Sequence, residues 1–192
     1  MITAIIMASG LSSRMGENKL LLNYNNKPII EYVFKAVKKS NFNEVIVVSQ
    51  YNEIEKLSKE YKFKYIHNEN ANTGQSESIK LGTLNSKKSD GYMFFVGDQP
   101  FIDIKHIETM IKTFNENKEY IIIPRYKNKS GNPVIFPYNK INELLNLKND
   151  EKGKKVITKT SKIKYVDVSE NMLFDIDTKE DYKKLGVGNE KS

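Results

Sequence analysis

The chain has no cysteine and only two histidines among its 192 residues. The lack of cysteine excludes disulfides, thiolate zinc sites and thiol nucleophiles, and it fits a reducing compartment. No apolar run approaches the ~18 residues that a membrane-spanning helix needs. The apolar stretch Ile2–Met7 has no basic region before it and is too short for a secretory signal. We therefore expect a cytoplasmic protein with no membrane partner, and structural roles for the isolated His67 and His106.

Arginine is also scarce, since Arg14 and Arg125 are the only arginines among 31 basic residues. Lysine serves wherever a generic positive charge is enough, so these two positions are candidates for planar, bidentate recognition of an anion. The net charge of +7 favours a polyanionic partner such as a nucleotide or a nucleic acid. However, lysines are spread along the chain and interleaved with acidic residues, which is typical of a solvated surface. We expect no nucleic-acid partner.

The length and the 39% of apolar residues fit one globular domain. Short apolar runs typical of strands occur at 3–7, 44–48, 64–67, 92–96, 120–124, 133–136 and 163–168. Helical spacing occurs after Pro28 and at 51–61, 76–84, 103–117, 139–147, 151–160 and 178–185, with Asp103 and Thr178 as N-caps. The alternation predicts an α/β fold: a single Rossmann-like domain over 1–186, with a mostly parallel sheet and helices on both faces. We expect a hairpin-like excursion after Arg125 and a flexible tail at 187–192.

Ligands of such sheets bind outside the carboxyl ends of the strands, and the first polar segment lies at such a place. Residues 7–19, MASGLSSRMGENK, follow the first predicted strand. Small residues let the main chain approach a ligand, and successive N–H groups can form an anion-binding nest. Arg14 and Lys19 add positive charge at its edges. The segment is neither a Walker loop nor G-x-G-x-x-G. It predicts a triphosphate-binding loop, with an ordinary βα turn as the alternative. Its candidate contacts are Ala8, Ser9, Gly10, Ser12, Arg14, Gly16 and Lys19.

This segment resembles the signature loop L-A-A-G-x-S-x-R-M-G-x-x-K of the MobA-like nucleotidyltransferases, which include the molybdenum cofactor cytidylyltransferases and guanylyltransferases. Ser9 departs from the Ala or Gly of the family, but it is small enough to keep the close approach. Similar boxes follow in the family's order from Ile2 to Leu185. The resemblance implies a fold of the nucleotide-diphospho-sugar transferase type.

The second similar box comprises Asn68 and the stretch GQSESI at 74–79. By itself, Ser76 is a candidate helix cap. The stretch resembles the N-P-x-x-x-x-G-x-x-S-S box of the cytidylyl branch more than the G-P-L-A-G of the guanylyl branch, although proline is missing after Asn68. The resemblance implies contacts to the base and ribose from Asn68, Gly74, Gln75, Ser76 and Ser78.

Two acidic boxes are candidates for a metal site. Asp98, in GDQP, follows a buried strand, where a carboxylate can bind Mg²⁺ together with phosphate oxygens. The stretch DIDTKED at 175–181 resembles the D-I-D-T-P-E-D box of the family. Asp175 and Asp177 alternate along an extended segment and so face opposite sides. We therefore expect Asp177 to complete the site, with Asp175 as the fallback.

A weaker box, GNPV at 131–134, resembles one on the acceptor side of the family. It makes Asn132 a candidate, and Arg125 nearby could meet an anionic acceptor. A turn into an edge strand is the alternative interpretation.

The resemblance implies an Mg²⁺-dependent transfer of CMP from CTP to molybdenum cofactor, with Arg14, Lys19 and Asp98 as the catalytic residues. Three alternatives stay open: the guanylyl version with GTP, transfer to another sugar or alcohol phosphate, and a non-catalytic carrier that hands the cofactor to a recipient molybdoenzyme.

Overall fold

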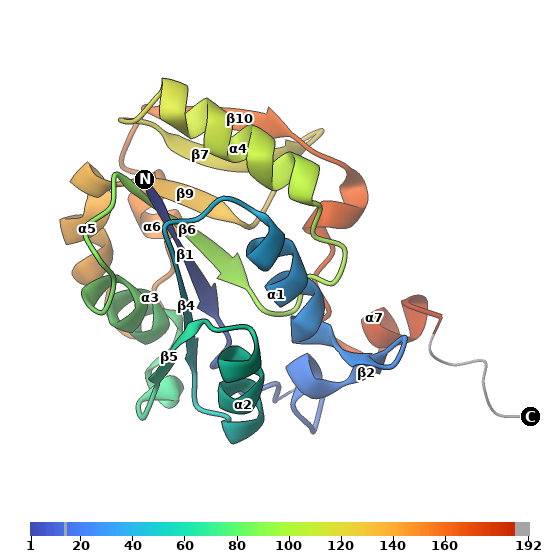
Figure 1. The fold of residues 1–192 in the computed structure, drawn as a ribbon. Helices are drawn as coiled ribbons and strands as arrows, with labels where there is room; N and C mark the ends of the chain where they lie inside the picture. Colours follow the sequence, from blue (N-terminus) through green and yellow to red (C-terminus); the bar gives the residue numbers. More distant parts are fainter. Residues whose placement is uncertain (14, 187–192) are drawn as a thin grey trace, which may run out of the picture.

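The computed structural model describes residues 1–13 and 15–186, so the expected tail at 187–192 lies outside the described residues. The described residues form one α/β domain with a mixed sheet between two layers of helices (Figure 1). Its order is β10-β7-β9-β6-β1-β4-β5, and β8 pairs with β7. The strands of this sheet are β1 Ile2–Met7, β4 Glu44–Ser49, β5 Lys64–His67, β6 Gly91–Val96, β7 Ile121–Tyr126, β8 Lys129–Ser130, β9 Val134–Pro137 and β10 Ile163–Asp167.

The expected parallel sheet is confirmed around β1, which pairs in parallel with both β4 and β6. The excursion after Arg125 is also present. β8 folds back on β7, and β9 inserts antiparallel between β6 and β7. Because β9 runs against its neighbours, β7 and β10 keep the direction of β6, and their carboxyl ends meet at the same edge of the sheet.

Helices cover both faces (Figure 1). The helices α1 Ile29–Lys39, α2 Asn52–Glu60 and α4 Ile104–Glu116 lie on one face, and α3 Gln75–Leu84, α5 Ile141–Leu145 and α6 Lys154–Ile157 lie on the other. Successive side chains of the central strands point to opposite faces of the sheet, so they pack against both layers of helices. In β6, for example, Phe95 packs into the first layer and Phe94 into the second.

Several elements differ from the sequence-based expectations. The helix predicted over 151–160 is only the single turn α6, and the one over 139–147 is a 3₁₀ turn at Tyr138–Lys140 followed by α5. The small hairpin of β2 Asn23–Tyr24 and β3 Lys27–Pro28 was not predicted, nor were the 3₁₀ turns at Lys19–Leu21, Ala71–Thr73 and Glu170–Leu173. These elements are too short to show a hydrophobic period.

The last helix, α7 Lys179–Lys184, lies beside the β2–β3 hairpin. A third apolar cluster joins this corner to the loop after β1, through Met15, Ile29, Ile176 and Leu185. Among the described residues, no helix is long and apolar enough to cross a membrane.

Candidate active site

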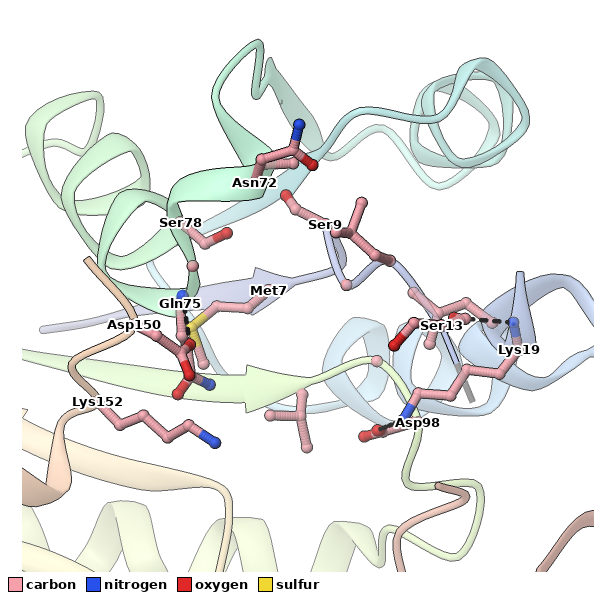
Figure 2. Close-up of a pocket in the computed structure, with 18 residues that line it drawn as sticks. Met7, Ser9, Ser13, Lys19, Asn72, Gln75, Ser78, Asp98, Asp150 and Lys152 are labelled. Atoms are coloured by element: carbon pink, nitrogen blue, oxygen red, sulfur yellow. Dashed lines mark hydrogen bonds and ion pairs between the residues drawn. The ribbon is translucent and has the colours of Figure 1, made fainter. Parts of the chain in front are cut away.

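A cavity of about 480 Å³ lies at the carboxyl ends of β1 and β6 (Figure 2). Its floor comes from the strand ends, including Met7 and Val96, and its walls come from three loops. Of the predicted nucleotide-binding and metal residues, those that line it are Ser9, Gly10, Ser12, Lys19, Gly74, Gln75, Ser78 and Asp98. The fold therefore brings together three boxes that are widely separated in the sequence.

The loop after β1 is held by its carbonyl groups. Side chains of the next strand end donate to them: Ser49 Oγ to Ala8 O at 2.9 Å, Gln50 Nε2 to Ser9 O at 3.0 Å, and Tyr51 Oη to Gly10 O at 2.9 Å. Within the part of the chain that the structure describes, the N–H groups of Ser9 and Gly10 donate no hydrogen bond. The carbonyls are thus used by the protein, and the N–H groups stay available to an anion.

Ser12 closes this loop with a φ of +52°, and its Oγ accepts the Lys19 N–H at 3.1 Å. Gly16 has a φ of +77°, a conformation that favours glycine. Arg14, predicted to contact phosphate, lies outside the described residues. Ala8 is buried beneath the loop and does not line the cavity.

Asn68 and Ser76 have structural contacts rather than positions on the cavity wall. Asn68 is 1% exposed, and its Nδ2 donates to Ser9 Oγ at 3.1 Å and to Ser78 Oγ at 3.3 Å. It thereby fixes two cavity-lining serines relative to each other. Ser76 is fully buried and donates to the carbonyl of Asn149 at 2.5 Å, so the cap of α3 is Gly74 and not Ser76.

At the other end of the cavity, two carboxylates converge on one lysine. Lys19 Nζ lies 2.5 Å from Asp98 Oδ2 and 2.8 Å from Asp177 Oδ1. Burial opposes the charge of Lys19, but the two carboxylates outweigh it and raise the pKa of the lysine. A main-chain bond from Ile176 N to Asp98 O, 3.1 Å long, brings the 175–177 segment to the end of β6.

Asp175 and Asp177 have different surroundings, as expected from their alternation. Asp177 reaches Lys19, whereas Asp175 Oδ1 accepts a 2.7 Å hydrogen bond from Gln99 Nε2. Asp175 keeps an exposed edge, but its loss of solvation, reinforced by the charge of Asp98, raises its pKa to about 6.

The acidic residues of this site fit a hard divalent cation. Asp98 Oδ1 is buried with no hydrogen-bond partner among the described residues, while Asp98 Oδ2 and Asp177 Oδ1 already share one cationic group. The described residues contain no group of three or more acidic, His or Cys side chains placed to hold a metal. A pair of carboxylates suits Mg²⁺ or Mn²⁺, which take their other ligands from substrate phosphates and water.

A second cavity, of about 410 Å³, adjoins the first and shares Met7, Gln75 and Lys152 with it. Asn132, predicted on the acceptor side, lines this second cavity. Arg125 does not line it: its guanidinium stacks 4.8 Å from the ring centre of Tyr165 and pairs with Asp167 at 3.3 Å. Most of the wall is apolar, formed by Ile79, Phe94, Ile123, Val134, Phe136 and Ile157.

Sequence reasoning missed the loop at 148–153, which supplies Asp150 and Lys152 to the first cavity. In the sequence, residues 148–150 lie between two predicted helices and residues 151–153 begin the second of them, and no motif marks this segment. The one residue of the predicted site that pointed to this loop is Gly74, because a glycine permits the close approach of another segment of main chain. Its φ of +112° favours glycine, and a Cβ on this residue would lie only 2.6 Å from Asp150 Cα.

The sheet order and the cavity at the carboxyl ends of the strands define a class of α/β proteins that bind ligands at this edge of the sheet. The family model of the MobA-like NTP transferase domain matches residues 4–164, and the chain belongs to this family. It is thus a nucleotidyltransferase of the MobA-like type.

Relatives and solved structures agree with this assignment. The chain is 30% identical over 138 residues to a probable molybdenum cofactor guanylyltransferase of Pyrococcus horikoshii, covering 71% of this chain and 69% of that protein. A protein of the same name from Natranaerobius thermophilus is 34% identical over 125 residues, which cover 64% of this chain and 60% of that protein. A nucleotidyl transferase structure from Methanothermobacter superposes with a TM-score of 0.83 at 21% identity, covering 96% and 95%. A manganese complex of Rv0371c from Mycobacterium tuberculosis gives 0.78 at 19% identity, covering 96% and 97%. At these identities, the structures show the shared fold.

Proposed function

We propose that this protein transfers a nucleoside monophosphate from an NTP to the terminal phosphate of a molybdopterin-type acceptor and releases pyrophosphate. The observation that carries the proposal is the convergence of Asp98 and Asp177 on Lys19, at the edge of a cavity that is also lined by Ser9 and Gly10 of the loop after β1. This arrangement offers positive charge, N–H donors and metal-binding oxygens to one triphosphate.

The NTP lies in the first cavity in this proposal. The N–H groups after β1, with Arg14 and Lys19, stabilise the phosphates, and the 68–78 segment surrounds the nucleoside. An oxygen of the acceptor phosphate forms a bond to the α-phosphorus. The bond from that phosphorus to the α,β-bridging oxygen breaks, and pyrophosphate leaves with the electron pair. Because the nucleophile is already anionic, no general base is required. Positioning and electrostatics then supply most of the rate.

Mg²⁺ is the proposed cofactor, held by Asp98 and Asp177, with Asp175 as the fallback ligand. When bound, it would neutralise the negative charge of the triphosphate. The pair of carboxylates supports a divalent cation, as does Asp98 Oδ1, which has no hydrogen-bond partner in residues 1–13 and 15–186. The manganese complex of a structural neighbour is consistent with that class of metal.

The names of the relatives favour GTP as the nucleotide, since two of them are called probable molybdenum cofactor guanylyltransferases. We therefore take the guanylyl version as the leading proposal. CTP is the second candidate, because the Gly74–Ser78 segment, of which Gly74, Gln75 and Ser78 line the cavity, resembles the cytidylyl branch. A structure similar in fold, with 15% identity and a TM-score of 0.78, is named as CMP:2-keto-3-deoxy-manno-octonic acid synthetase complexed with CTP.

The acceptor lies in the second cavity in this proposal. Its apolar wall suits a flat organic ring system, and Asn132 offers an amide to the polar atoms of such a ring. Arg125 contributes through its stacking on Tyr165, which lines that cavity. Another sugar or alcohol phosphate remains the alternative acceptor.

The experiment measures pyrophosphate release from GTP, CTP, UTP and ATP with Mg²⁺ and purified molybdenum cofactor. We expect release from one nucleotide, with GTP the leading candidate. We also expect a loss of about 10²–10³-fold in Asp98→Ala, the scale for one preorganised electrostatic contact. The control is Glu108→Ala, an exposed residue of α4.

Each outcome decides between the candidates. Release from CTP alone would replace the guanylyl proposal by the cytidylyl one. Undiminished turnover of Asp98→Ala at saturating Mg²⁺ would remove Asp98 from the metal site. Nucleotide binding without release from any NTP would support a carrier or a different phosphorylated acceptor.

A further inference from the structure

Lys152 stands at the junction of the two cavities. It belongs to the 148–153 loop between α5 and α6 and lines both cavities. Lys19 lines only the first, and Lys154 lines only the second. Figure 2 shows Lys152 on the side of the first cavity opposite Lys19 and Asp98. Among the described residues, Lys152 is therefore the one cation that both cavities share.

The loop that carries Lys152 is anchored to the N-terminal turn of α3. Ser76 Oγ donates to Asn149 O at 2.5 Å, and Gln75 N donates to Asp150 Oδ1 at 3.5 Å. Gly74 allows the two main chains to approach, since a Cβ there would lie 2.6 Å from Asp150 Cα. Within the loop, Lys148 N donates to Glu151 Oε2 at 2.9 Å. These hydrogen bonds between side chains and main-chain atoms position the main chain beside Lys152, while the side chain of Lys152 is exposed.

The charge of Lys152 is also available. In residues 1–13 and 15–186, its Nζ makes no hydrogen bond and no ion pair, whereas Lys19 is shared by two carboxylates and Lys155 pairs with Glu151. A lysine ammonium provides three donors, and neither described cavity wall offers it a carboxylate within ion-pair distance.

We propose that Lys152 binds the attacking phosphate of the acceptor and holds it against the α-phosphate of the nucleotide. The inference rests on the proposed function and assigns a further catalytic residue to it. As the acceptor oxygen bonds to the α-phosphorus and pyrophosphate departs, two anionic groups must come within bonding distance. A cation between them offsets their repulsion and orients the nucleophile. Lys19, at the other end of the first cavity, lies beside the leaving group.

The test compares Lys152→Met with Lys152→Arg and with Lys159→Met, a matched control on an exposed lysine that lines neither cavity. We expect Lys152→Met to raise the KM for the acceptor and lower kcat, together by about tenfold or more, the scale of one hydrogen bond to a charged group. The KM for the NTP should stay within about twofold, and Lys152→Arg should recover most of the activity. A rise in the NTP KM alone, or no change at all, would overturn the assignment.

A binding measurement separates this inference from the proposed function. Inorganic phosphate is titrated into each protein, with the NTP cavity filled by a non-hydrolysable analogue, and its line width is followed by ³¹P NMR. Weaker phosphate binding in Lys152→Met, with Lys159→Met unchanged, supports the assignment even if the wild-type protein transfers no nucleotide. Equal binding by all three proteins, or none by the wild type, overturns it. Lack of turnover by the wild type would reject only the proposed function.

Discussion

At the scale of single residues, the site depends on small groups that set distances between loops. Ser9 and Gly10 place main-chain N–H groups at the cavity, and Asn68 holds Ser9 and Ser78 together. These residues are far apart in the sequence, and two motifs identify them, because the residues of each motif have a specific spacing. What the motif does not give is whether a residue touches the ligand or supports one that does. The amide of Asn68 is hydrogen-bonded inside the protein, to Ser9, Ser78 and the N–H of Asn70.

Gly74→Ala tests the approach of the two loops. The φ of +112° strains any other residue, and the new Cβ would lie 2.6 Å from Asp150 Cα. We expect a loss of about 1 kcal/mol or more in the free energy of unfolding, measured by urea denaturation. The control is Gly10→Ala, because nothing lies within 4 Å of its Cβ position. Equal stabilities of the two variants would mean that the 148–153 loop shifts away from residue 74 without loss of stability.

At the scale of elements, most helices and strands follow from local signals. Pro28 precedes α1, Asp103 caps α4 through the Lys105 N–H, and Thr178 caps α7, all as predicted. The helix predicted over 151–160 was wrong in extent, because the residues before and at its expected start are engaged elsewhere. Asn149 O and the carboxylate of Asp150 accept hydrogen bonds from the first turn of α3, and Glu151 N closes a turn on Lys148 O. Tertiary contacts thus override a helical pattern of lysines and apolar residues.

The capping box of α7 predicts a pH-dependent stability. The hydrogen bond from Lys184 and then the one from Thr178 lower the pKa of Asp181 to about 2. An unfolded aspartate has a pKa of about 3.9. Because the folded pKa is the lower one, the contribution of Asp181 to stability is present above about pH 4 and is lost as the pH falls toward 2.

Asp181→Asn removes this contribution. At pH 7 we expect a loss on the order of 1 kcal/mol in the free energy of unfolding. The difference from the wild type should shrink as the pH falls from about 4 to about 2, measured by chemical denaturation at a series of pH values. Glu180→Gln, on an exposed residue of the same helix, serves as the control. A difference that stays constant over this range would contradict the cap.

At the scale of the whole molecule, the central strands connect the core to the site. β6 carries Phe95 into the first apolar layer and ends immediately before Gly97 and Asp98. The position of Asp98 therefore depends on how well β6 is packed between β1 and β9.

Phe95→Ala should destabilise the protein by about 3–5 kcal/mol, because Phe95 is fully buried and its removal leaves a cavity. The measurement is the free energy of unfolding in guanidinium chloride. Leu84→Ala is the control, since Leu84 is 68% exposed and its removal should change the stability by less than about 0.5 kcal/mol. Similar losses in both variants would show that β6 is not the centre of the core.

The sequence by itself determined the family, the α/β class with the order of its longer strands and helices, and the motifs at residues 7–19, 97–100 and 175–181. These features are local, since they rest on hydrophobic period, caps and motif spacing. Only the tertiary structure decided which residues of each box face the cavity, that Asp177 rather than Asp175 meets Lys19, and that the 148–153 loop joins the site. The physical reason is that these features depend on contacts between segments that are distant in the sequence. β9 pairs between β6 and β7, and the lack of a side chain at Gly74 lets the 148–153 loop pack against the start of α3. Contacts of such range leave no period in the sequence.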